Sequence, residues 1–365
     1  HIILHLQNNK LTMNFTNSLI QWYLQNKRDL PWRDTQNPYH IWLSEIMLQQ
    51  TRVAQGLPYY LSFTTAFPTV FNLANASEEQ VLKLWQGLGY YSRARNLHAT
   101  AQFVAFELNG IFPDNYNDLL KLRGVGEYTA AAIASFSYNE VVPVVDGNVY
   151  RVLSRFFDIE TDIASSSARK EFSEMALALM PKKDPATFNQ AIMEFGALQC
   201  VPKSPDCENC VLNFGCLALK NKKVNVLPFK SKKVKVKNRY FNYIIFLDEN
   251  KNTIIHKRSA KGIWHNLFEF PLIETLETEN LEDILVKIPE YNFVKNKIIS
   301  VKPMHSKTEI HKLTHQHLHI NFWGVNVEDK IPESINYESL ILFPFPIVIY
   351  NFIEREKNSF KNLYI

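Results

Sequence analysis

The apolar residues between positions 15 and 219 follow helical spacing. They recur at intervals of three and four, which places them on one face of an α-helix. Turn signals containing proline, glycine or asparagine separate the segments, for example at 36–38 and 109–114. The pattern predicts an all-α region of roughly ten helices. Residues 141–145 are mostly valine, but Pro143 favours an extended link over a sheet strand.

The pattern changes after residue 221, where apolar and polar residues alternate or β-branched residues cluster. Such runs predict strands, and two stretches with helical spacing interrupt and close them. The predicted strands are residues 240–247, 253–257, 297–301, 318–325 and 341–342. The predicted helices are residues 281–288 and 347–356. This second region is therefore expected to be an α+β domain.

Length and charge add domain boundaries to this picture. A chain of 365 residues is long enough for two or three domains, and its net charge is only +4. Six Lys or Arg residues nevertheless occur within 230–239 without an acid, which predicts a basic, solvated linker over 221–239 that could also contact phosphate. We expect an all-α domain over 13–220 and an α+β domain over 240–365. Residues 1–12 are expected to be an upstream remnant, because Met13 resembles a native start.

No apolar run approaches the length that a membrane span needs. The longest candidate, residues 341–350, is interrupted by two prolines. The sequence therefore predicts a protein that does not enter a membrane.

All the cysteines of the chain lie in one short loop. They are Cys200, Cys207, Cys210 and Cys216. The segment also contains Pro202 and Pro205, so it cannot continue the preceding helix. Four thiolates this close together predict a metal site over 200–216, and the spacing permits either tetrahedral zinc or a [4Fe–4S] cluster.

A tight turn containing Gly124 and Gly126 precedes the alanine-rich run 129–134. Small side chains allow a helix to begin directly after the turn, and the free N–H groups at such a helix start can hold a phosphate. A ligand-free corner between two helices is the alternative interpretation of the same pattern.

Two carboxylates stand out for acid–base chemistry. Asp146 precedes a helix predicted to follow Gly147, where the helix dipole and free N–H groups keep a carboxylate ionised. Glu45 lies on a helix that is apolar almost all round, where desolvation raises the pKa and favours the neutral acid. One neutral and one charged carboxyl group form the pair that cleavage of a glycosidic bond requires, although a helix cap and an edge glutamate are the simpler interpretations.

Two further segments carry side chains that suit an extruded base. Residues 49–51 end the Glu45 helix with two amides and a hydroxyl, and residues 87–95 place aromatic and arginine side chains on a turn flanked by glycines. Such groups can fill the gap that a flipped base leaves. Because two arginines accompany two tyrosines, we expect this turn to be exposed.

These motifs together resemble the helix-hairpin-helix DNA glycosylases of the endonuclease III superfamily. Segments 30–33, 44–51 and 87–97 resemble its adenine-removing branch, whose members act on adenine mispaired with 8-oxoguanine. The resemblance implies that Glu45 protonates adenine, that Asp146 stabilises or traps the sugar cation, and that Tyr128 and Asn148 support this site. Tyr128 stands where endonuclease III has a Schiff-base lysine, which implies a monofunctional enzyme or weak lyase.

The resemblance also implies a cofactor, a partner and the remaining contacts. The cofactor would be a [4Fe–4S] cluster, the partner duplex DNA with adenine opposite 8-oxoguanine or guanine, and the enzyme a monomer in the bacterial cytosol near the nucleoid. The implied substrate and DNA contacts are Leu30, Trp32, Arg33, Gln50, Thr51, Leu88, Tyr90, Gly124, Gly126 and Gln190.

The C-terminal region resembles the Nudix-like domain that reads 8-oxoguanine in this branch. Residues 262–271 resemble its Trp-containing element, whereas the acidic signature of an active Nudix pyrophosphatase is absent. Thr314 and His315 fall where the branch has a serine and a histidine, in a loop whose hydroxyl contacts the damaged base. Thr314 keeps a hydroxyl, whereas Leu313 replaces an aromatic residue there and loses its stacking. The histidines at 315, 317 and 319 alternate along one predicted strand, and we expect them to face DNA and not to bind a metal.

Two other functions fit parts of the same pattern. One is a non-catalytic iron–sulfur protein that binds DNA without releasing a base. The other is a mismatch glycosylase that removes thymine. The presence of both carboxylates favours an enzyme, and the long C-terminal region favours adenine.

Overall fold

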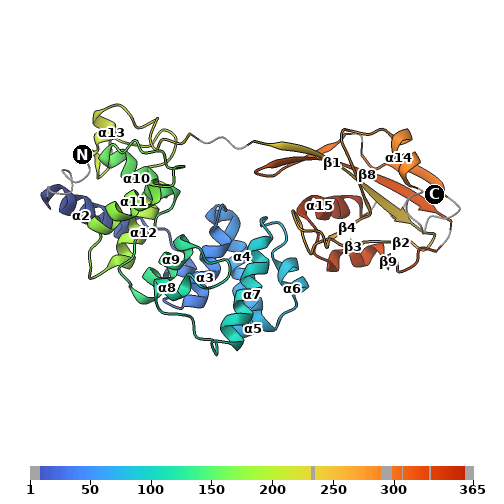
Figure 1. The fold of residues 1–365 in the computed structure, drawn as a ribbon, viewed down its shortest axis with the longest axis horizontal. Coiled ribbons are helices and arrows are strands. Elements are labelled where there is room, and N and C mark those ends of the chain that lie inside the picture. The colour runs from blue at the N-terminus through green and yellow to red at the C-terminus, as the bar shows by residue number, and fades with distance from the viewer. Residues whose placement is uncertain (1–8, 232–234, 289–297, 306, 329, 358–365) are drawn as a thin grey trace. The chain divides into compact units, whose positions relative to one another are not determined.

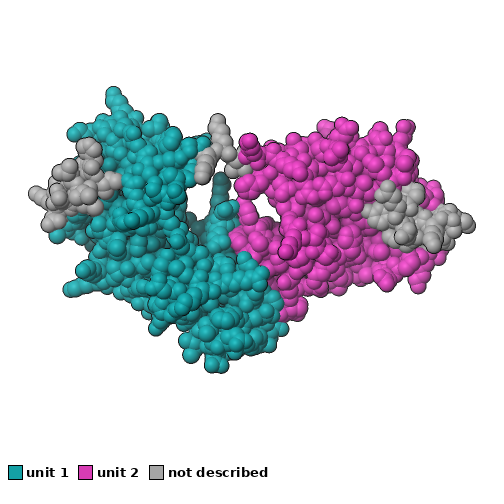
Figure 2. Space-filling view, viewed as in Figure 1, with its two compact units in different colours: residues 1–75, 96–232 teal, residues 76–95, 233–365 magenta. Residues whose placement is uncertain are grey.

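The structure is a computed structural model that describes residues 9–231, 235–288, 298–305, 307–328 and 330–357. The chain folds into two compact units, one formed by residues 1–75 and 96–232 and the other by residues 76–95 and 233–365 (Figure 2). Among the described residues, none of the helices combines the length and the apolar character that crossing a lipid bilayer requires.

The first unit is helical throughout its described part, as the sequence predicts (Figure 1). Its α-helices are α2 Asn9–Asn26, α3 Pro38–Leu48, α4 Val53–Ala66, α5 Val70–Asn75, α7 Ser92–Phe106 (whose first four residues belong to the second unit), α8 Tyr116–Leu119, α9 Glu127–Tyr138, α10 Gly147–Phe157, α11 Ala168–Leu179, α12 Pro185–Leu198 and α13 Leu217–Lys220. Two short 3-10 helices are η1 Pro31–Arg33 and η2 Asn213–Gly215. Residues 141–145 form no strand, which confirms the expected extended link.

Two groups of helices build the core of this unit. Helices α2, α10, α11 and α12 enclose a large apolar cluster that includes Phe15, Phe172 and Phe188, all fully buried. Helix α3 packs against α9, whose Ala131 and Ala132 are buried and allow the two helices to approach closely. Burial of these apolar faces positions α3, α9, α10 and α12 around a common space.

The second unit is an α+β fold, also as predicted. Its helices are α6 Glu78–Leu84, α14 Leu281–Lys287, η4 Tyr337–Leu342 and α15 Ile347–Glu356. Its strands are β1 Lys237–Leu247, β2 Asn252–Thr253, β3 His256–Lys257, β4 Phe268–Glu269, β5 Leu272–Thr275, β6 Ile298–Pro303, β7 Glu309–Lys312, β8 Gln316–Val327 and β9 Ile335–Asn336. The main sheet has the order β5-β1-β8-β6, with β7 also paired to β8. Strands β1 and β8 are parallel and the other pairs are antiparallel.

Several predicted strands differ from the structure in their details. Residues 341–342 lie in the 3-10 helix η4 and not in a strand, because a pair of apolar residues is too short to distinguish the two. The predicted strand 253–257 is divided into β2 and β3, which belong to different two-stranded sheets. The first residue of the predicted strand 297–301 lies outside the described residues.

The basic segment after the cysteine loop is folded back onto the first unit over most of its described length. Lys223 forms ion pairs with Asp158, at 2.8 Å, and with Glu160, at 2.5 Å. Leu227 is buried, and the Phe229 carbonyl accepts a hydrogen bond from the Ile163 N–H at 3.0 Å. Strand β1 begins at residue 237. The segment therefore contacts the loop that follows α10, although most of its residues up to 231 are exposed, and residues 237–239 belong to the sheet.

Candidate active site

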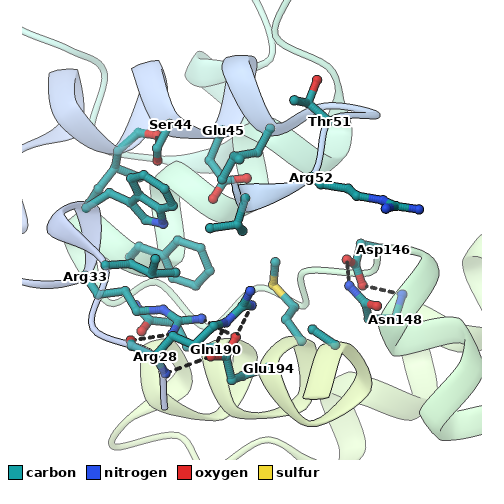
Figure 3. Close-up of a pocket in the computed structure, with 18 of the residues that line it drawn as sticks. Arg28, Arg33, Ser44, Glu45, Thr51, Arg52, Asp146, Asn148, Gln190 and Glu194 are labelled. Carbon is teal, nitrogen blue, oxygen red and sulfur yellow. Dashed lines mark hydrogen bonds and ion pairs between the residues drawn. The ribbon is translucent and has the colours of Figure 1, made fainter. Parts of the chain in front are cut away.

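A cavity of about 650 Å³ opens between α3 and η1 on one side and α10 and α12 on the other (Figure 3). Its volume lies within the range of about 300–1,000 Å³ that is usual for small-molecule sites. It brings together nine of the residues that the sequence singles out, namely Leu30, Trp32, Arg33, Glu45, Thr51, Tyr128, Asp146, Asn148 and Gln190. Residues from segments more than 100 positions apart therefore meet in one site.

Glu45 projects into this cavity from the apolar helix α3 (Figure 3). Glu45 is only 6% exposed. Burial raises the pKa of Glu45 to about 7, although a hydrogen bond from the Tyr128 hydroxyl opposes this rise. Burial also raises the pKa of Tyr128 well above its usual value, so the phenol stays protonated and can donate that bond. The predicted direction of the Glu45 shift is confirmed.

Asp146 lies at the N-cap of α10, across the cavity from Glu45 (Figure 3). Its Oδ1 atom accepts hydrogen bonds from the N–H groups of Asn148 and Val149, both at 2.8 Å, and its Oδ2 atom accepts one from the Asn148 amide at 2.7 Å. The predicted cap is therefore confirmed, and the donors act on the carboxylate in the direction that the cap implies. Burial raises the pKa of Asp146 and outweighs the three donors, which lower it.

Asn148 is held in place by two residues that the sequence analysis missed. The Nη2 atom of Arg151 donates to Asn148 Oδ1 at 2.8 Å and to the Gly196 carbonyl at 2.6 Å, while Nε donates to the Cys200 carbonyl at 2.7 Å. Gly196 lies so close to Asn148 that an added Cβ would meet the Asn148 Cβ at 2.6 Å. The three-residue spacing of Asn148 and Arg151 on one helix face was the available signal.

A buried ionic cluster forms another wall of the cavity and was also missed. Glu194 on α12, whose side chain is 1% exposed, pairs with Arg28 at 2.6 Å and Arg33 at 2.7 Å. Burial alone would raise the pKa of Glu194, but the hydrogen bonds from both arginines lower it to about 2. Arg33 is thus paired with the Glu194 carboxylate. The neighbouring Trp32 is buried and packs edge-on against Tyr60, with 5.0 Å between the ring centroids.

Gly124, Gly126 and Gln50 do not line the cavity, whereas Thr51, just after α3, does. Gly124 has a φ of 75°, in the left-handed region that favours glycine, and an added Cβ would meet Asn96 at 2.7 Å. Gly126 is the N-cap of α9 and has open space where a Cβ would be. Gln50 is exposed in the left-handed region, and Thr51 lines the cavity rim. The local turn geometry therefore agrees with the predicted hairpin.

The four cysteines lie together, as their mutual electrostatic interactions indicate. They are Cys200, Cys207, Cys210 and Cys216, all free thiols of intermediate exposure. Burial raises the pKa of Cys210 to about 11, and Arg155 donates to the Cys200 sulfur at 3.4 Å. Such a set of thiols with a buried cation beside it suits an all-thiolate metal group. In the described part of the chain, no group of three or more His, Cys, Asp or Glu side chains is placed so that it could hold a metal ion.

A second cavity, of about 470 Å³, lies within the second unit. Tyr90, Thr314 and His315 line it, and the Tyr90 and Thr314 hydroxyls are hydrogen bonded at 2.5 Å. The expected exposure of the turn 87–95 holds for Tyr90, which is 47% exposed, but is wrong for Leu88 and Tyr91, which are buried. The apolar surfaces of Leu88 and Tyr91 pack inside the unit. The presence of arginines in the turn was therefore not a reliable sign that the neighbouring residues are exposed.

The alternating histidines are only partly in one strand. His317 and His319 lie in β8, and His315 precedes it. The His319 ring stacks on Tyr240 of β1 at 4.7 Å. Their neighbours therefore include an aromatic ring of the adjacent strand.

Family models match both halves of the chain. One, described as HhH-GPD superfamily base excision DNA repair protein, matches residues 43–176. Another, described as a NUDIX domain, matches residues 242–355. The first match contains Glu45, Tyr128, Asp146 and Asn148, and the second contains the main sheet of the second unit apart from the first five residues of β1.

Curated relatives are similar over most of the chain. An adenine DNA glycosylase of Buchnera aphidicola subsp. Schizaphis graminum is 34% identical over 84% of this chain and 86% of its own. Its counterpart in Buchnera aphidicola subsp. Baizongia pistaciae is 35% identical over 92% of this chain and 95% of its own. The adenine DNA glycosylase of Rattus norvegicus is 45% identical over 56% of this chain and 41% of its own.

Solved structures are similar to the helical part. A thermostable thymine-DNA glycosylase has a TM-score of 0.55 and 28% identity, covering 58% of this chain and 98% of that chain. A non-covalent endonuclease III–DNA complex has a TM-score of 0.50 and 21% identity, covering 57% of this chain and 94% of that chain. These likenesses agree with the helical architecture of the first unit.

Proposed function

The chain belongs to the adenine DNA glycosylases, base excision repair enzymes that hydrolyse N-glycosyl bonds, and we propose that it removes adenine mispaired with 8-oxoguanine, or with guanine, from duplex DNA. The observation that carries the proposal is that Glu45 and Asp146 face the same cavity, in which Glu45 is the more poorly hydrogen-bonded carboxyl group. A flipped-out base would enter between them.

The proposed reaction uses Glu45 as the acid. With a pKa of about 7, a substantial fraction of Glu45 is protonated at neutral pH and can transfer its proton to a ring nitrogen of adenine. The bond between C1′ and N9 then breaks, its electron pair leaves with adenine, and positive charge develops on the sugar. Asp146 stabilises or traps this cation. Water adds to C1′ and returns a proton to Glu45, so that the balanced outcome is hydrolysis to free adenine and an abasic sugar.

The surrounding residues are proposed to support this step. Tyr128 hydrogen bonds to Glu45, and Asn148 hydrogen bonds to Asp146, so both hold a carboxyl group in place. Leu30, Trp32 and Gln190 would line the adenine pocket. Arg33 would keep one wall of the pocket in place by its ion pair with Glu194. Because Tyr128 carries no amine, it offers no nucleophile for a Schiff base with the sugar, and we propose little or no strand cleavage.

We propose that the remaining contacts grip the duplex and read the base opposite adenine. Gly124 and Gly126 would present the start of α9 to a phosphate. Gln50, Thr51 and Tyr90 would contact the damaged guanine, as would Thr314 and His315 of the C-terminal domain, whereas the buried Leu88 would support the turn that carries Tyr90. The support is the exposed Tyr90 hydroxyl beside Thr314.

We further propose that Cys200, Cys207, Cys210 and Cys216 hold a [4Fe–4S] cluster. The donor set fits, because all four ligands would be thiolates and Arg155 lies against one sulfur. The cluster, when bound, would cross-link the loop and carry no step of the hydrolysis. Iron and sulfide analysis of the purified protein, with a broad absorption band at about 400 nm, would distinguish it from zinc.

A base-release assay tests the function. The substrate is a duplex with one adenine opposite 8-oxoguanine, compared with adenine opposite guanine and with thymine opposite guanine. We expect free adenine from the wild type and a loss of more than about a hundredfold in Glu45→Gln and Asp146→Asn. Preferential thymine release would favour the thymine-removing alternative. Tight duplex binding without base release would favour a non-catalytic protein, and full activity in both variants would reject the mechanism.

The organisation of the chain is proposed on the same basis. The proposed glycosylase domain over 13–220 contains the first family match, and the proposed Nudix-like domain over 240–365 contains the second. The segment 221–239 would join the two domains. A monomer acting on DNA in a bacterial cytosol is proposed from family membership.

A further inference from the structure

The hydroxyl of Tyr23 contacts Gln190, a residue of the cavity lining, although Tyr23 itself does not line the cavity. Tyr23, on α2, is 4% exposed and donates a hydrogen bond to Oε1 of Gln190, on α12. The two residues are 167 positions apart in the sequence, so only the packing of α2 on α12 brings them together.

This contact determines which end of the Gln190 amide faces the cavity. A tyrosine hydroxyl has one hydrogen to donate, and in the described part of the chain Gln190 is its one hydrogen-bond partner. If the amide were reversed, the buried O–H would face an NH2 group and lose its acceptor, which is unfavourable. The observed orientation satisfies the O–H and leaves the NH2 group of Gln190 for the cavity.

The Tyr23 ring is itself held in place by charged neighbours. The guanidinium of Arg33 lies 5.7 Å from the ring centroid and the ammonium of Lys27 lies 5.9 Å from it. Arg33 is fixed in turn by the buried carboxylate of Glu194. Burial, together with the carboxylates of Glu194 and Asp184, raises the pKa of Tyr23, so the hydroxyl keeps its proton.

We infer that Tyr23 is a positioning residue for base recognition: its hydroxyl locks Gln190 so that the amide presents hydrogen-bond donors, and not an acceptor, to the base in the cavity. The inference rests on the proposed function and deepens it. The site would select a base that offers an acceptor, such as an unprotonated ring nitrogen, at the position facing Gln190.

A double-mutant cycle tests this role in the full-length protein. The rate constant of adenine release is measured under single-turnover conditions on the duplex with adenine opposite 8-oxoguanine, together with the affinity for the duplex. We expect Tyr23→Phe to lower the rate about three- to tenfold, the equivalent of one neutral hydrogen bond. Duplex affinity should change by less than about twofold, because phosphate contacts dominate it.

The cycle is completed by removing the amide. In Gln190→Leu the rate should fall, and adding Tyr23→Phe should then change it by less than about twofold, because Tyr23 acts through Gln190. Gln190→Glu keeps an acceptor for Tyr23 but has no NH2 group, and we expect it to lose as much activity as Gln190→Leu.

Tyr39→Phe is the matched control. Tyr39 is equally buried, at 4% exposure, and its hydroxyl donates to the Phe67 carbonyl at 2.6 Å away from the cavity lining. Its rate should stay within about twofold of the wild type. Equal losses in Tyr39→Phe and Tyr23→Phe would overturn the inference, as would the same loss from Tyr23→Phe in both backgrounds or full activity of Gln190→Glu. A wild type that releases no adenine would instead reject the proposed function itself.

Discussion

The guanidinium of Arg151 binds the side chain of Asn148 on one side and the Cys200 carbonyl on the other. The Nη2 to Oδ1 distance to Asn148 is 2.8 Å, and the Nε to O distance to Cys200 is 2.7 Å. Asn148 in turn donates to Asp146 at 2.7 Å. The cysteine loop is thus connected by consecutive hydrogen bonds to a carboxylate of the cavity.

Replacing Arg151 should therefore reduce activity without touching the cavity carboxylates. In Arg151→Met, the Oδ1 atom of Asn148 no longer receives a hydrogen bond from the guanidinium. The amide can then turn away from Asp146, which loses one of its hydrogen-bond donors. We expect the single-turnover rate of adenine release to fall roughly three- to thirtyfold, as for one or two hydrogen bonds. Lys170→Met, at a position whose side chain is 83% exposed, is the control and should behave like the wild type. An unchanged rate in Arg151→Met would show that this connection does not support Asp146.

The pKa of Glu45 predicts how the rate depends on pH. Since the protonated carboxyl group is the proposed acid and its pKa is about 7, the rate should be highest below that value. Above it, the rate should fall by about tenfold for each pH unit, because the fraction of protonated Glu45 falls in that proportion. Single-turnover rates measured from about pH 5.5 to about pH 8.5 would check this. A profile that is flat across this range would contradict Glu45 as the proton donor.

The same shift predicts a cost in stability that Glu45→Gln should relieve. The unfolded state deprotonates near 4.5 and the folded state near 7, so the folded state binds the proton more tightly. The stability that protonation contributes is full below pH 4.5 and is lost as the pH rises through 7. At about pH 8 the uncharged Glu45→Gln variant should be more stable than the wild type by up to about 3 kcal/mol. Urea unfolding at about pH 8 and about pH 5 provides the comparison, and the difference should nearly vanish at the lower pH.

The sequence indicated the parts of the site that depend on local patterns. The apolar helix around Glu45 and the cap at Asp146 could be predicted because helix periodicity and N-cap preference involve residues a few positions apart. The direction of the Asp146 pKa shift could not, because it depends on how deeply the rest of the fold buries the cap. Glu194 was missed for the same reason: its partners Arg28 and Arg33 lie more than 160 positions away.

In the fold, too, the features that depend on local patterns were predicted and those that depend on long-range contacts were not. Long strands such as β1 and β8 were predicted from extended alternation, whereas two-residue strands such as β4 carry too little pattern to identify. The buried positions of Leu88 and Tyr91 also depend on contacts within the second unit that no local pattern encodes.

Gly196 should be intolerant of even one added carbon. It lies within α12 with a helical neighbour on each side, where alanine would normally be favoured by about 1 kcal/mol. Its Cβ would, however, lie 2.6 Å from the Asn148 Cβ and 2.9 Å from the Asn148 carbonyl oxygen, so α10 would have to move away from α12. We expect Gly196→Ala to lower the free energy of unfolding by about 1–3 kcal/mol. The rate of adenine release should fall as well, since Asn148 carries the displacement to Asp146.

Gly147→Ala separates this clash from a general effect of glycine replacement. Gly147 begins α10 next to the same asparagine, but an added Cβ there meets no atom within 4 Å. Its free energy of unfolding, measured by urea denaturation, should therefore equal or exceed that of the wild type. If Gly196→Ala were as stable as Gly147→Ala, the close approach of α12 to Asn148 would not be what holds the capping carboxylate in position, and the contacts of Arg151 alone would have to account for it.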